Sequence, residues 1–394
     1  MLNVLYNIFK IFVVYLLRLI LSIFWIIPVK KNKVVFTSYE GRQYSCNPKY
    51  LFEYMINHYG NIFSYIWVIN KASILPGEFK KNKTVKFLSF WYFFHILTAE
   101  IIIENSAVKC YLPFRKKQVI VNTWHGGGAY KKVSTDALTY QKKMISMKIA
   151  KRINAKTIKY VISSCEKFTA VSSKVWAIPD EKFLAIGMPR NDIFFNISDS
   201  IKRKVKDFFI LEGDEKIILY APTYRGDYRN ADSIDFSLDI ERLLQAFTKR
   251  FEHNFIFLYR SHIFNKLNLS IINSNIVSAT NYPDMQELLL AADIFITDYS
   301  SSIWDYSFTF KPCFIYAPDL KQYHKEHGFY TPIEEWPFPL AVNNGQLVDN
   351  ILNFNEDLYK QAVIKHHADM GSYENGTACE QFCKIVFDRQ IYNG

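Results

Sequence analysis

The 394-residue chain has few cysteines and none of the short motifs that identify a metal or nucleotide site on their own. Its six cysteines are scattered, with no CxxC pair and no histidine at zinc-ligand spacing, which disfavours a zinc site or a disulfide framework and favours a reducing, cytosolic environment. Cys379 and Cys383, four residues apart on a predicted helix, are interpreted as packing residues. The chain also has no GxGxxG fingerprint, no Walker A loop, no DxD-like cluster at a predicted strand end, no internal repeat and no low-complexity tract. Its chemistry must therefore be inferred from other clusters of residues.

The composition is that of a globular protein with an excess of positive charge. Hydrophobic residues make up 49% of the chain and charged residues 22%, which excludes fibrous and disordered classes, and a length of 394 residues favours two domains. The 48 lysines and arginines and 37 acids give a net charge of +11, which indicates a phosphorylated substrate, an anionic lipid surface or a nucleic acid as partner. No base-stacking or groove-reading motif accompanies this charge, so a nucleic acid is not expected.

The stretch 2–27 is almost wholly apolar, but it has no basic start and no A-x-A-like cleavage site, so a cleaved signal peptide fits poorly. Lys10 and Arg18 each oppose insertion into a bilayer by about 2.5–3.5 kcal/mol, whereas each apolar side chain favours it by roughly 0.3–0.6 kcal/mol, so the energy alone does not decide between spanning and lying on the membrane. The polar residues share one helical stripe, broken only by Val14: Asn3, Asn7, Lys10, Arg18 and Ser22. We therefore predict an in-plane, monotopic helix with one wet side and with Lys30, Lys31 and Lys33 at its exit. A spanning helix and a buried core helix are the alternatives.

Beyond Lys33, short β-branched and aromatic runs alternate with helical patterns, which is typical of βαβ units and parallel sheets. The predicted strands form one set at 34–39, 65–69, 100–105 and 118–124 and a second at 216–223, 255–260, 292–298 and 313–319. This pattern predicts an α/β chain with two doubly wound sheets, separated by the charge-rich helical stretch around 198–215. The predicted organisation is a membrane-associated helix at 1–29, Rossmann-like domains at 30–205 and 206–375, and a C-terminal helix at 376–394 that packs back on the first domain.

Most polar clusters directly follow predicted strands, where open α/β sheets bind their ligands. The strand at 118–124 leads into His125, Gly126 and Gly127. The glycines of this loop allow backbone N–H groups to approach an anion, and the histidine can take a proton from a hydroxyl, although a plain turn with a satisfied histidine is the alternative. A second turn, at 187–192, contains Pro189, Arg190, Asn191 and Asp192. Its arginine suits a phosphate, with an ordinary surface turn as the alternative.

Three further clusters follow strands of the second set. Thr223 and Arg225 lie at the end of the first of these strands, and Arg260 and His262 lie at the end of the second. Asp298, Ser300, Ser301 and Ser302 close the third strand and open a helix. Serine hydroxyls and free N–H groups at a helix start suit an anion, although simple helix capping also explains the serines. A carboxylate is an odd neighbour for phosphate, so we expect Asp298 to hold a loop in place.

A basic segment at 142–159 is predicted to be an amphipathic helix. Ile145, Ile149 and Ile153 share one stripe, and a second stripe is basic: Lys148, Arg152, Lys156 and Lys159. Such a helix suits anionic lipid or a polyanionic product, with a solvated surface helix as the alternative.

In the order and spacing of its motifs, the chain resembles the CDP-glycerol glycerophosphotransferase family of teichoic-acid synthesis. The motifs are WHGGGAYKK, GMPRND, YAPTYR, RSH, ADIFITDYSSSIWDYSFTFKPCFIYAPDLKQY and, at 328–335, GFYTPIEE. The resemblance covers about residues 119–352. It implies a GT-B architecture of two Rossmann-like domains facing a cleft, with an acceptor domain first and a donor-binding domain second. It also implies monotopic attachment to the cytoplasmic face of the cell membrane.

The resemblance further implies a role for individual residues. His125 would be the base and His262 a second catalytic histidine, whereas Arg225, Ser300 and Ser301 would lie around the pyrophosphate of the donor. Thr223, Arg260 and Ser302 are grouped with these donor-binding residues. The loop residues Gly126, Gly127, Asp298, Pro189, Arg190, Asn191 and Asp192 are given structural roles.

The expected function is transfer of a polyol phosphate from a CDP-activated donor to a lipid-linked or polymer acceptor, with release of CMP. Glycerol phosphate is the favoured polyol phosphate. No tightly bound metal or cofactor is expected, and assistance by free Mg²⁺ stays open. A GT-B glycosyltransferase that uses a nucleotide sugar is the main alternative, and a non-catalytic lipid- or polymer-binding protein is the second. Ribitol and glycerol are not distinguished by the residues.

Overall fold

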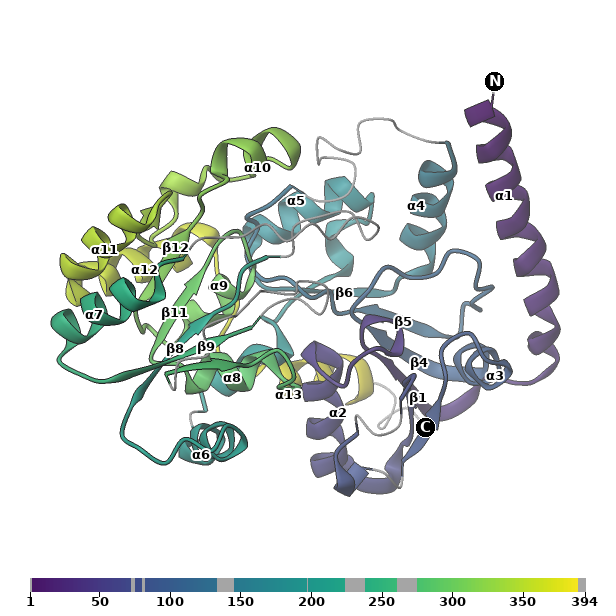
Figure 1. Ribbon diagram of the computed structural model, residues 1–394. Helices are drawn as coiled ribbons and strands as arrows, with labels where there is room; N and C mark the ends of the chain where they lie inside the picture. The colour runs from purple at the N-terminus through teal and green to yellow at the C-terminus, as the bar shows by residue number, and fades with distance from the viewer. Residues whose placement is uncertain are drawn as a thin grey trace.

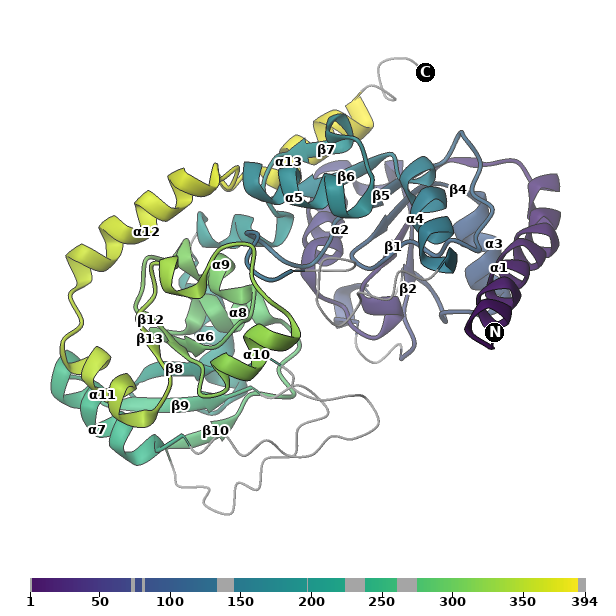
Figure 2. The same cartoon turned by 90° about the horizontal axis from the view of Figure 1, so that it is seen from above.

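The computed structural model describes residues 2–71, 75–79, 82–132, 145–196, 198–223, 238–260 and 275–388, and it contains two parallel sheets flanked by helices (Figure 1). The prediction of an α/β chain with two doubly wound sheets is confirmed. The two sheets belong to two lobes that lie side by side (Figure 2).

The first sheet has seven strands in the order β3-β2-β1-β4-β5-β6-β7, and every pairing is parallel. Its strands are β1 (Lys30–Thr37), β2 (Ser64–Val68), β3 (Lys83–Val85), β4 (Ala99–Glu104), β5 (Val119–Asn122), β6 (Tyr160–Ser163) and β7 (Phe183–Ala185). The helices along this part of the chain are α1 (Leu2–Leu21), α2 (Cys46–Tyr59), α3 (Phe90–Thr98), α4 (Ile145–Thr157) and α5 (Glu166–Trp176). The central strands are continuous apolar runs because a parallel sheet is covered on both faces.

The second sheet has six parallel strands in the order β10-β9-β8-β11-β12-β13. Its strands are β8 (Lys216–Tyr220), β9 (Phe255–Tyr259), β10 (Ile276–Ser278), β11 (Ile294–Thr297), β12 (Cys313–Tyr316) and β13 (Leu340–Ala341). The helices from α6 onward are α6 (Asp199–Phe208), α7 (Ile240–Phe251), α8 (Met285–Ala291), α9 (Ser302–Ser307), α10 (Leu320–Glu326), α11 (Asn344–Leu352), α12 (Glu356–Met370) and α13 (Ala378–Cys383). α6 connects the two sheets and packs on α8.

The end of the described chain returns to the first sheet. α12 leads from the second lobe to the first, and α13 lies beside the first sheet (Figure 2). Cys379, Phe382 and Cys383 are buried with Met55 of α2 in one core cluster. The interpretation of the two cysteines as packing residues is confirmed.

The N-terminal helix lies beside α4 at one edge of the molecule (Figure 1), and residues of its polar stripe contact the rest of the protein. Arg18 donates two hydrogen bonds, to the carbonyl oxygens of Cys110 at 2.7 Å and Leu112 at 2.8 Å, and the side-chain oxygen of Asn7 accepts one from the Ser146 hydroxyl at 2.7 Å. The predicted wet side is therefore wrong for Asn7 and Arg18, because polar groups of the protein satisfy them in place of water. Of the two charged residues on this stripe, Lys10 is exposed and Arg18 is half-buried.

The outward face of this segment is apolar and open. Its exposed large side chains are Leu5, Tyr6, Ile8, Phe9, Phe12, Tyr15, Leu16, Leu19, Ile20, Ile23, Trp25, Ile26 and Ile27. The stretch Leu5–Ile26 is long and apolar enough to cross a membrane, and only 11% of its most apolar window is buried. The alternative of a buried core helix is therefore wrong.

In both sheets the strand order reverses beside the first strand, between β1 and β4 and between β8 and β11. Open α/β sheets bind ligands in the crevice that forms at such a reversal, beyond the carboxyl ends of the strands. These two positions therefore define where a site is expected.

Candidate active site

His125 lies on the loop that follows β5, next to the strand reversal of the first sheet. One ring nitrogen, Nδ1, is 2.7 Å from the carbonyl oxygen of Asn105, which follows β4. A carbonyl oxygen can only accept, so Nδ1 carries the proton and Nε2 keeps its lone pair in the neutral ring. Burial lowers the pKa of His125 to about 4, and the positive charges of Arg190 and Lys131 lower it further, against the opposing effect of the hydrogen bond to Asn105. The ring is therefore neutral near pH 7 and able to accept a proton at Nε2.

Asn105 also positions a tyrosine beside this histidine. Its side-chain oxygen accepts a hydrogen bond from the backbone N–H of Tyr39 at 2.8 Å, and the rings of Tyr39 and His125 have centroids 5.6 Å apart. Tyr39 and Trp124 have positive φ angles of 46° and 52°, a backbone conformation that bulky residues rarely adopt. Local strain of this kind often occurs at functional sites. Our sequence analysis missed Tyr39 and Asn105, although each is the last residue of a predicted strand.

The glycines after His125 allow the second domain to approach. A Cβ atom on Gly127 would lie 2.0 Å from Cδ1 of Trp304, and one on Gly126 would lie 3.2 Å from the Ser301 hydroxyl. The backbone N–H of Gly128 donates to the hydroxyl of Ser164 at 3.1 Å. Close packing on α9 thus explains these glycines, and the N–H of Gly128 is not available to an anion. The same packing brings His125 to the start of α9.

Arg190 occupies a buried position between the domains, where our sequence analysis expected a surface turn or a phosphate ligand. Its guanidinium forms an ion pair with Asp305 of α9 at 2.8 Å and donates to the carbonyl oxygen of His125 at 2.7 Å. Only 4% of Arg190 is exposed, so its charge is committed to these partners. The residue joins the histidine loop to the second domain.

The other residues of this turn hold the end of the chain. The carboxylate of Asp192 accepts from the backbone N–H groups of Ala378 and Cys379 at the start of α13, at 2.9 and 2.8 Å. The amide of Asn191 donates to Glu374 at 3.0 Å, and the carbonyl oxygen of Pro189 lies 3.7 Å from the Cys379 sulfur.

Glu374 is a half-buried acid that our sequence analysis missed. It accepts hydrogen bonds from the Trp304 indole at 3.1 Å, the backbone N–H of Met188 at 2.9 Å and the Asn191 amide. Burial raises the pKa of Glu374 to about 8. A neutral carboxyl thus links the turn after β7, α9 and the returning C-terminal segment.

The second domain places its polar residues at the reversal between β8 and β11. Asp298 accepts hydrogen bonds from the backbone N–H of Thr223 at 2.9 Å and from its hydroxyl at 2.6 Å, so it ties the loop after β8 to the end of β11. Arg260 follows β9 and donates to the carbonyl oxygen of Tyr282 at 2.8 Å. Its Nε and Nη2 have no partner among the described residues.

The serines stand at the start of α9, beside the histidine loop. The hydroxyls of Ser300 and Ser302 are 2.8 Å apart, and the Ser300 hydroxyl accepts from the backbone N–H of Ser302 at 3.3 Å. Ser301 lies against Gly126. The structure thus brings His125 and the three serines together, whereas Arg225 and His262 lie outside the described residues.

The described ranges contain no group of three His, Cys, Asp or Glu residues arranged to hold a metal ion. No disulfide joins the six cysteines, all of which lie in the described ranges, and five of them are buried.

Two Rossmann-like sheets, with a histidine loop between them, define a GT-B-like fold. The chain belongs to the CDP-glycerol:poly(glycerophosphate) glycerophosphotransferase family, which matches residues 19–388. The resemblance expected from the motifs is confirmed.

The relatives named here make teichoic acids. The chain is 30% identical over 371 residues to the teichoic acid poly(glycerol phosphate) polymerase of Staphylococcus epidermidis, covering 91% of this chain and 51% of that protein. It is 26% identical over 385 residues to the teichoic acid ribitol-phosphate polymerase TarK of Staphylococcus aureus, covering 95% and 72%. The solved structure of the wall teichoic acid polymerase TagF has a TM-score of 0.82 and 26% identity, covering 99% of this chain and 98% of that chain. The chain spans about half the length of the poly(glycerol phosphate) polymerases that it matches first.

Proposed function

We propose that this chain transfers a polyol phosphate from a CDP-activated donor to a hydroxyl of an acceptor and releases CMP. Glycerol phosphate is the polyol phosphate that we favour. The observation that carries the proposal is the neutral His125, with its lone pair on Nε2, held against the start of α9. Membership of the glycerophosphotransferase family supports the donor class.

In this mechanism Nε2 of His125 takes the proton of the acceptor hydroxyl while its oxygen attacks the distal phosphorus of the donor. The bond from that phosphorus to the bridging oxygen breaks, the electron pair leaves with CMP, and a phosphodiester remains. The proton on His125 is then lost to solvent. Phosphoryl transfer depends mainly on positioning and on neutralising charge, so covalent help from the protein is not needed.

The second domain would hold the donor. The hydroxyls of Ser300, Ser301 and Ser302 are donors suited to the pyrophosphate, and so are Nε and Nη2 of Arg260, which have no partner within the described part of the chain. Arg225 and His262 are kept in the proposal as donor ligand and second catalytic group on the family resemblance. We expect no tightly bound cofactor to be required, with free Mg²⁺ as the remaining alternative.

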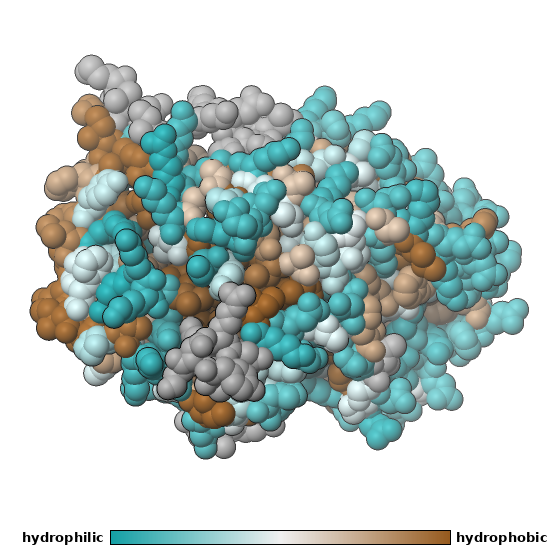
Figure 3. All heavy atoms as spheres, turned by 180° about the vertical axis from the view of Figure 1, so that it is seen from behind, coloured by the Kyte–Doolittle hydropathy of each residue, from teal (hydrophilic) through white to brown (hydrophobic). Residues whose placement is uncertain are grey.

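We propose that the chain attaches to the cytoplasmic face of the membrane in the plane of the lipid surface. The open apolar face of α1 continues onto the exposed rings of Phe90 and Trp91 on α3, and Figure 3 shows apolar atoms gathered at that edge of the molecule. The basic side chains of Lys148, Arg152 and Lys156 on the neighbouring α4 are exposed, which suits anionic lipid.

The docking of α1 favours this arrangement over a spanning helix. Arg18 is bonded to the carbonyl oxygens of Cys110 and Leu112, and the Trp25 indole donates to the carbonyl oxygen of Pro113. A spanning α1 would have to leave these partners or carry a polar, irregular segment into the hydrocarbon layer, where unsatisfied backbone groups are costly.

The experiment that tests the function measures CMP after incubation of the full chain with CDP-glycerol and, separately, with CDP-ribitol. Release of CMP that depends on His125 supports the proposal. Release of a nucleoside diphosphate from a nucleotide sugar would instead identify a glycosyltransferase, and turnover of neither substrate would leave the binding-protein alternative.

A further inference from the structure

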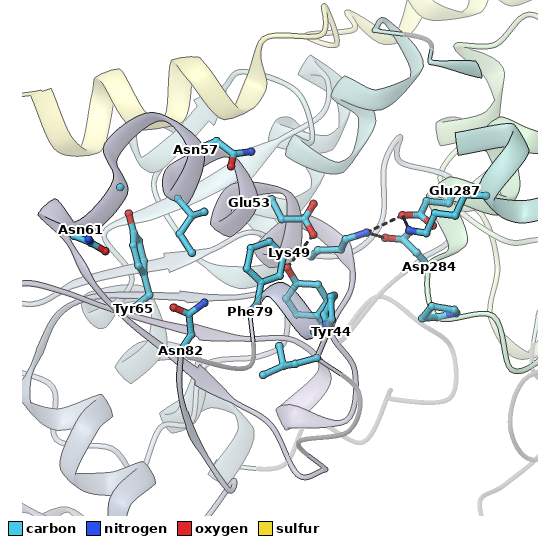
Figure 4. A pocket seen from close by; sticks show the side chains of 17 residues that line it. Tyr44, Lys49, Glu53, Asn57, Asn61, Tyr65, Phe79, Asn82, Asp284 and Glu287 are labelled. Atoms are coloured by element: carbon cyan, nitrogen blue, oxygen red, sulfur yellow. Dashed lines mark hydrogen bonds and ion pairs between the residues drawn. The ribbon is translucent and has the colours of Figure 1, made fainter. Parts of the chain in front are cut away.

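A large cavity opens between the two domains on the side of α2 (Figure 4). Its volume is about 1070 Å³. From the first domain, Tyr44 and Phe79 lie on the connections that follow β1 and β2, and from the second, Pro283 and Asp284 lie on the connection that follows β10. The cavity therefore reaches the carboxyl ends of both sheets, where ligands of such folds bind. None of the residues assigned to the active site above lines it.

α2 gives this cavity one continuous wall. Lys49, Glu53 and Asn57 are spaced four residues apart and so lie on one face of the helix. At the start of the same helix, Asn47 donates to the carbonyl oxygens of Thr123 and Trp124 at 2.9 and 3.1 Å. One rigid element thus connects the cavity wall to the loop that carries His125.

The positive charges of the wall are already paired. Lys49 binds Asp284 and Glu287 across the domain boundary, and Lys204 binds Glu287 at 2.9 Å. No lysine or arginine without an acidic partner lines the described part of the cavity. This part of the wall therefore offers no unpaired positive charge to a phosphate.

The groups left for a ligand are neutral or accept hydrogen bonds. Nδ2 of Asn82 is buried and has no hydrogen-bond partner within the described ranges. One carboxyl oxygen of Glu53 accepts a hydrogen bond from the Tyr44 hydroxyl at 2.9 Å. Burial raises the pKa of Glu53, against the opposing effect of the Lys49 charge. The amides of Asn57 and Asn61 and the ring of Phe79 complete the wall. Amides, a carboxyl group and aromatic rings together suit the hydroxyls and C–H faces of a sugar or polyol.

We infer that this cavity binds a neutral, hydroxyl-rich part of the acceptor, a sugar or polyol without phosphate. That the ligand is the acceptor rests on the proposed function. The cavity and the chemistry of its wall do not depend on it. A ligand seated along α2 has one end near the first turn of that helix and hence beside the His125 loop.

Saturation-transfer NMR on the full chain in detergent tests the binding, with CMP added to occupy the donor site. The probes are glycerol, ribitol and glucose, with glycerol 3-phosphate as the anionic comparison. We expect signal from at least one neutral probe that falls about 5–10-fold in Asn82→Leu and in Asn57→Ala, since each removes about one hydrogen bond to the ligand. Asn353→Leu, at an exposed site after α11, is the matched control and should keep the signal.

The second readout is kinetic. Asn57→Ala changes an exposed side chain, so it should fold normally, raise the KM for the acceptor about 5–10-fold and leave the KM for the CDP-polyol unchanged. Tighter binding of glycerol 3-phosphate than of glycerol, or neutral binding that is equal in all variants, overturns the inference. If the wild type binds a neutral probe through Asn82 but releases no CMP from any CDP-polyol, the proposed function fails and the cavity assignment stands.

Discussion

At the residue scale, the pKa of His125 makes a prediction about pH. Burial lowers this pKa from 6.5 to about 4, so the ring stays neutral as the pH falls toward 5. A general base loses activity only when it is protonated, and kcat/KM reports the base of the free enzyme. We therefore expect the acid limb of the kcat/KM profile to lie clearly below pH 6.5. A limb at or above 6.5 would mean that His125 is not the base or is not buried as described.

Replacing the two histidines should have different effects. His125→Ala should lower kcat roughly 10²–10⁴-fold, the usual range for a lost general base, with little change in affinity for the CDP-polyol. His262→Ala should weaken donor binding as well as turnover, because our proposal groups it with the residues that bind the donor. Calorimetric titration of CDP-glycerol separates the two. If His125→Ala loses donor binding and His262→Ala keeps it, the assigned roles are wrong.

Glu374 should make stability fall as the pH rises. Its folded pKa is about 8, above the ordinary 4.5, so its contribution is fully present below about pH 4.5 and is lost as the pH rises through 8. Glu374→Gln cannot ionise and should remove this part of the pH dependence, worth roughly a few kcal/mol. Urea unfolding at pH 5, 7 and 9 measures it. Parallel pH profiles for the two proteins would show that Glu374 is ionised in the folded state.

At the scale of elements, α1 should be separable from the folded body. Deleting residues 1–29 should release the protein from membranes and leave a cooperative melting transition, because β1 begins at Lys30. Flotation on liposomes and thermal melting are the measurements. An aggregated product without a cooperative melt would show that the described contacts of Arg18 and Trp25 are essential to the fold.

The polar stripe of α1 predicts the effect of a single change there. Arg18→Leu removes two hydrogen bonds to backbone carbonyls and one of the two charges that oppose insertion, so α1 should undock and insert more deeply. Lys10→Leu, at an exposed position, is the matched control and should leave α1 docked. Protease protection of α1 in liposomes distinguishes the variants, and equal protection in both would contradict the docking role of Arg18.

The strands were predictable where they are long and buried. The predicted strands overlap β1, β2, β4, β5, β8, β9, β11 and β12. β6 was not predicted, and the short strands β3, β10 and β13 offered too few residues to show a pattern. The polar stripe on α1 was correct as a pattern, but a pattern does not say whether water or protein covers it.

Asp298 was expected to hold a loop, and in the structure it accepts a hydrogen bond from the backbone N–H of Thr223. The pairs Arg190–Asp305 and Lys49–Asp284 join residues far apart in the chain, so no local signal predicts them.

At the scale of the whole molecule, the buried pair of Arg190 and Asp305 fixes the first domain against the second. Arg190→Met leaves Asp305 buried without its ion-pair partner, although the Gln286 amide still donates to it, and should cost about 3–5 kcal/mol of stability. The double change Arg190→Met with Asp305→Leu should recover most of this loss, which a double-mutant cycle of unfolding free energies measures. A single change that costs less than about 1 kcal/mol would place the pair in solvent rather than between the domains.

The central claim is that the two domains bring a CDP-polyol to His125. Its most direct test is the CMP released by the full chain from CDP-glycerol and CDP-ribitol, compared with His125→Ala and with a nucleotide sugar as substrate. The account predicts CMP from at least one CDP-polyol, roughly 10²–10⁴-fold less from His125→Ala, and no nucleoside diphosphate from the nucleotide sugar. Equal CMP release by the wild type and His125→Ala, or nucleoside diphosphate release from the sugar donor alone, would contradict it.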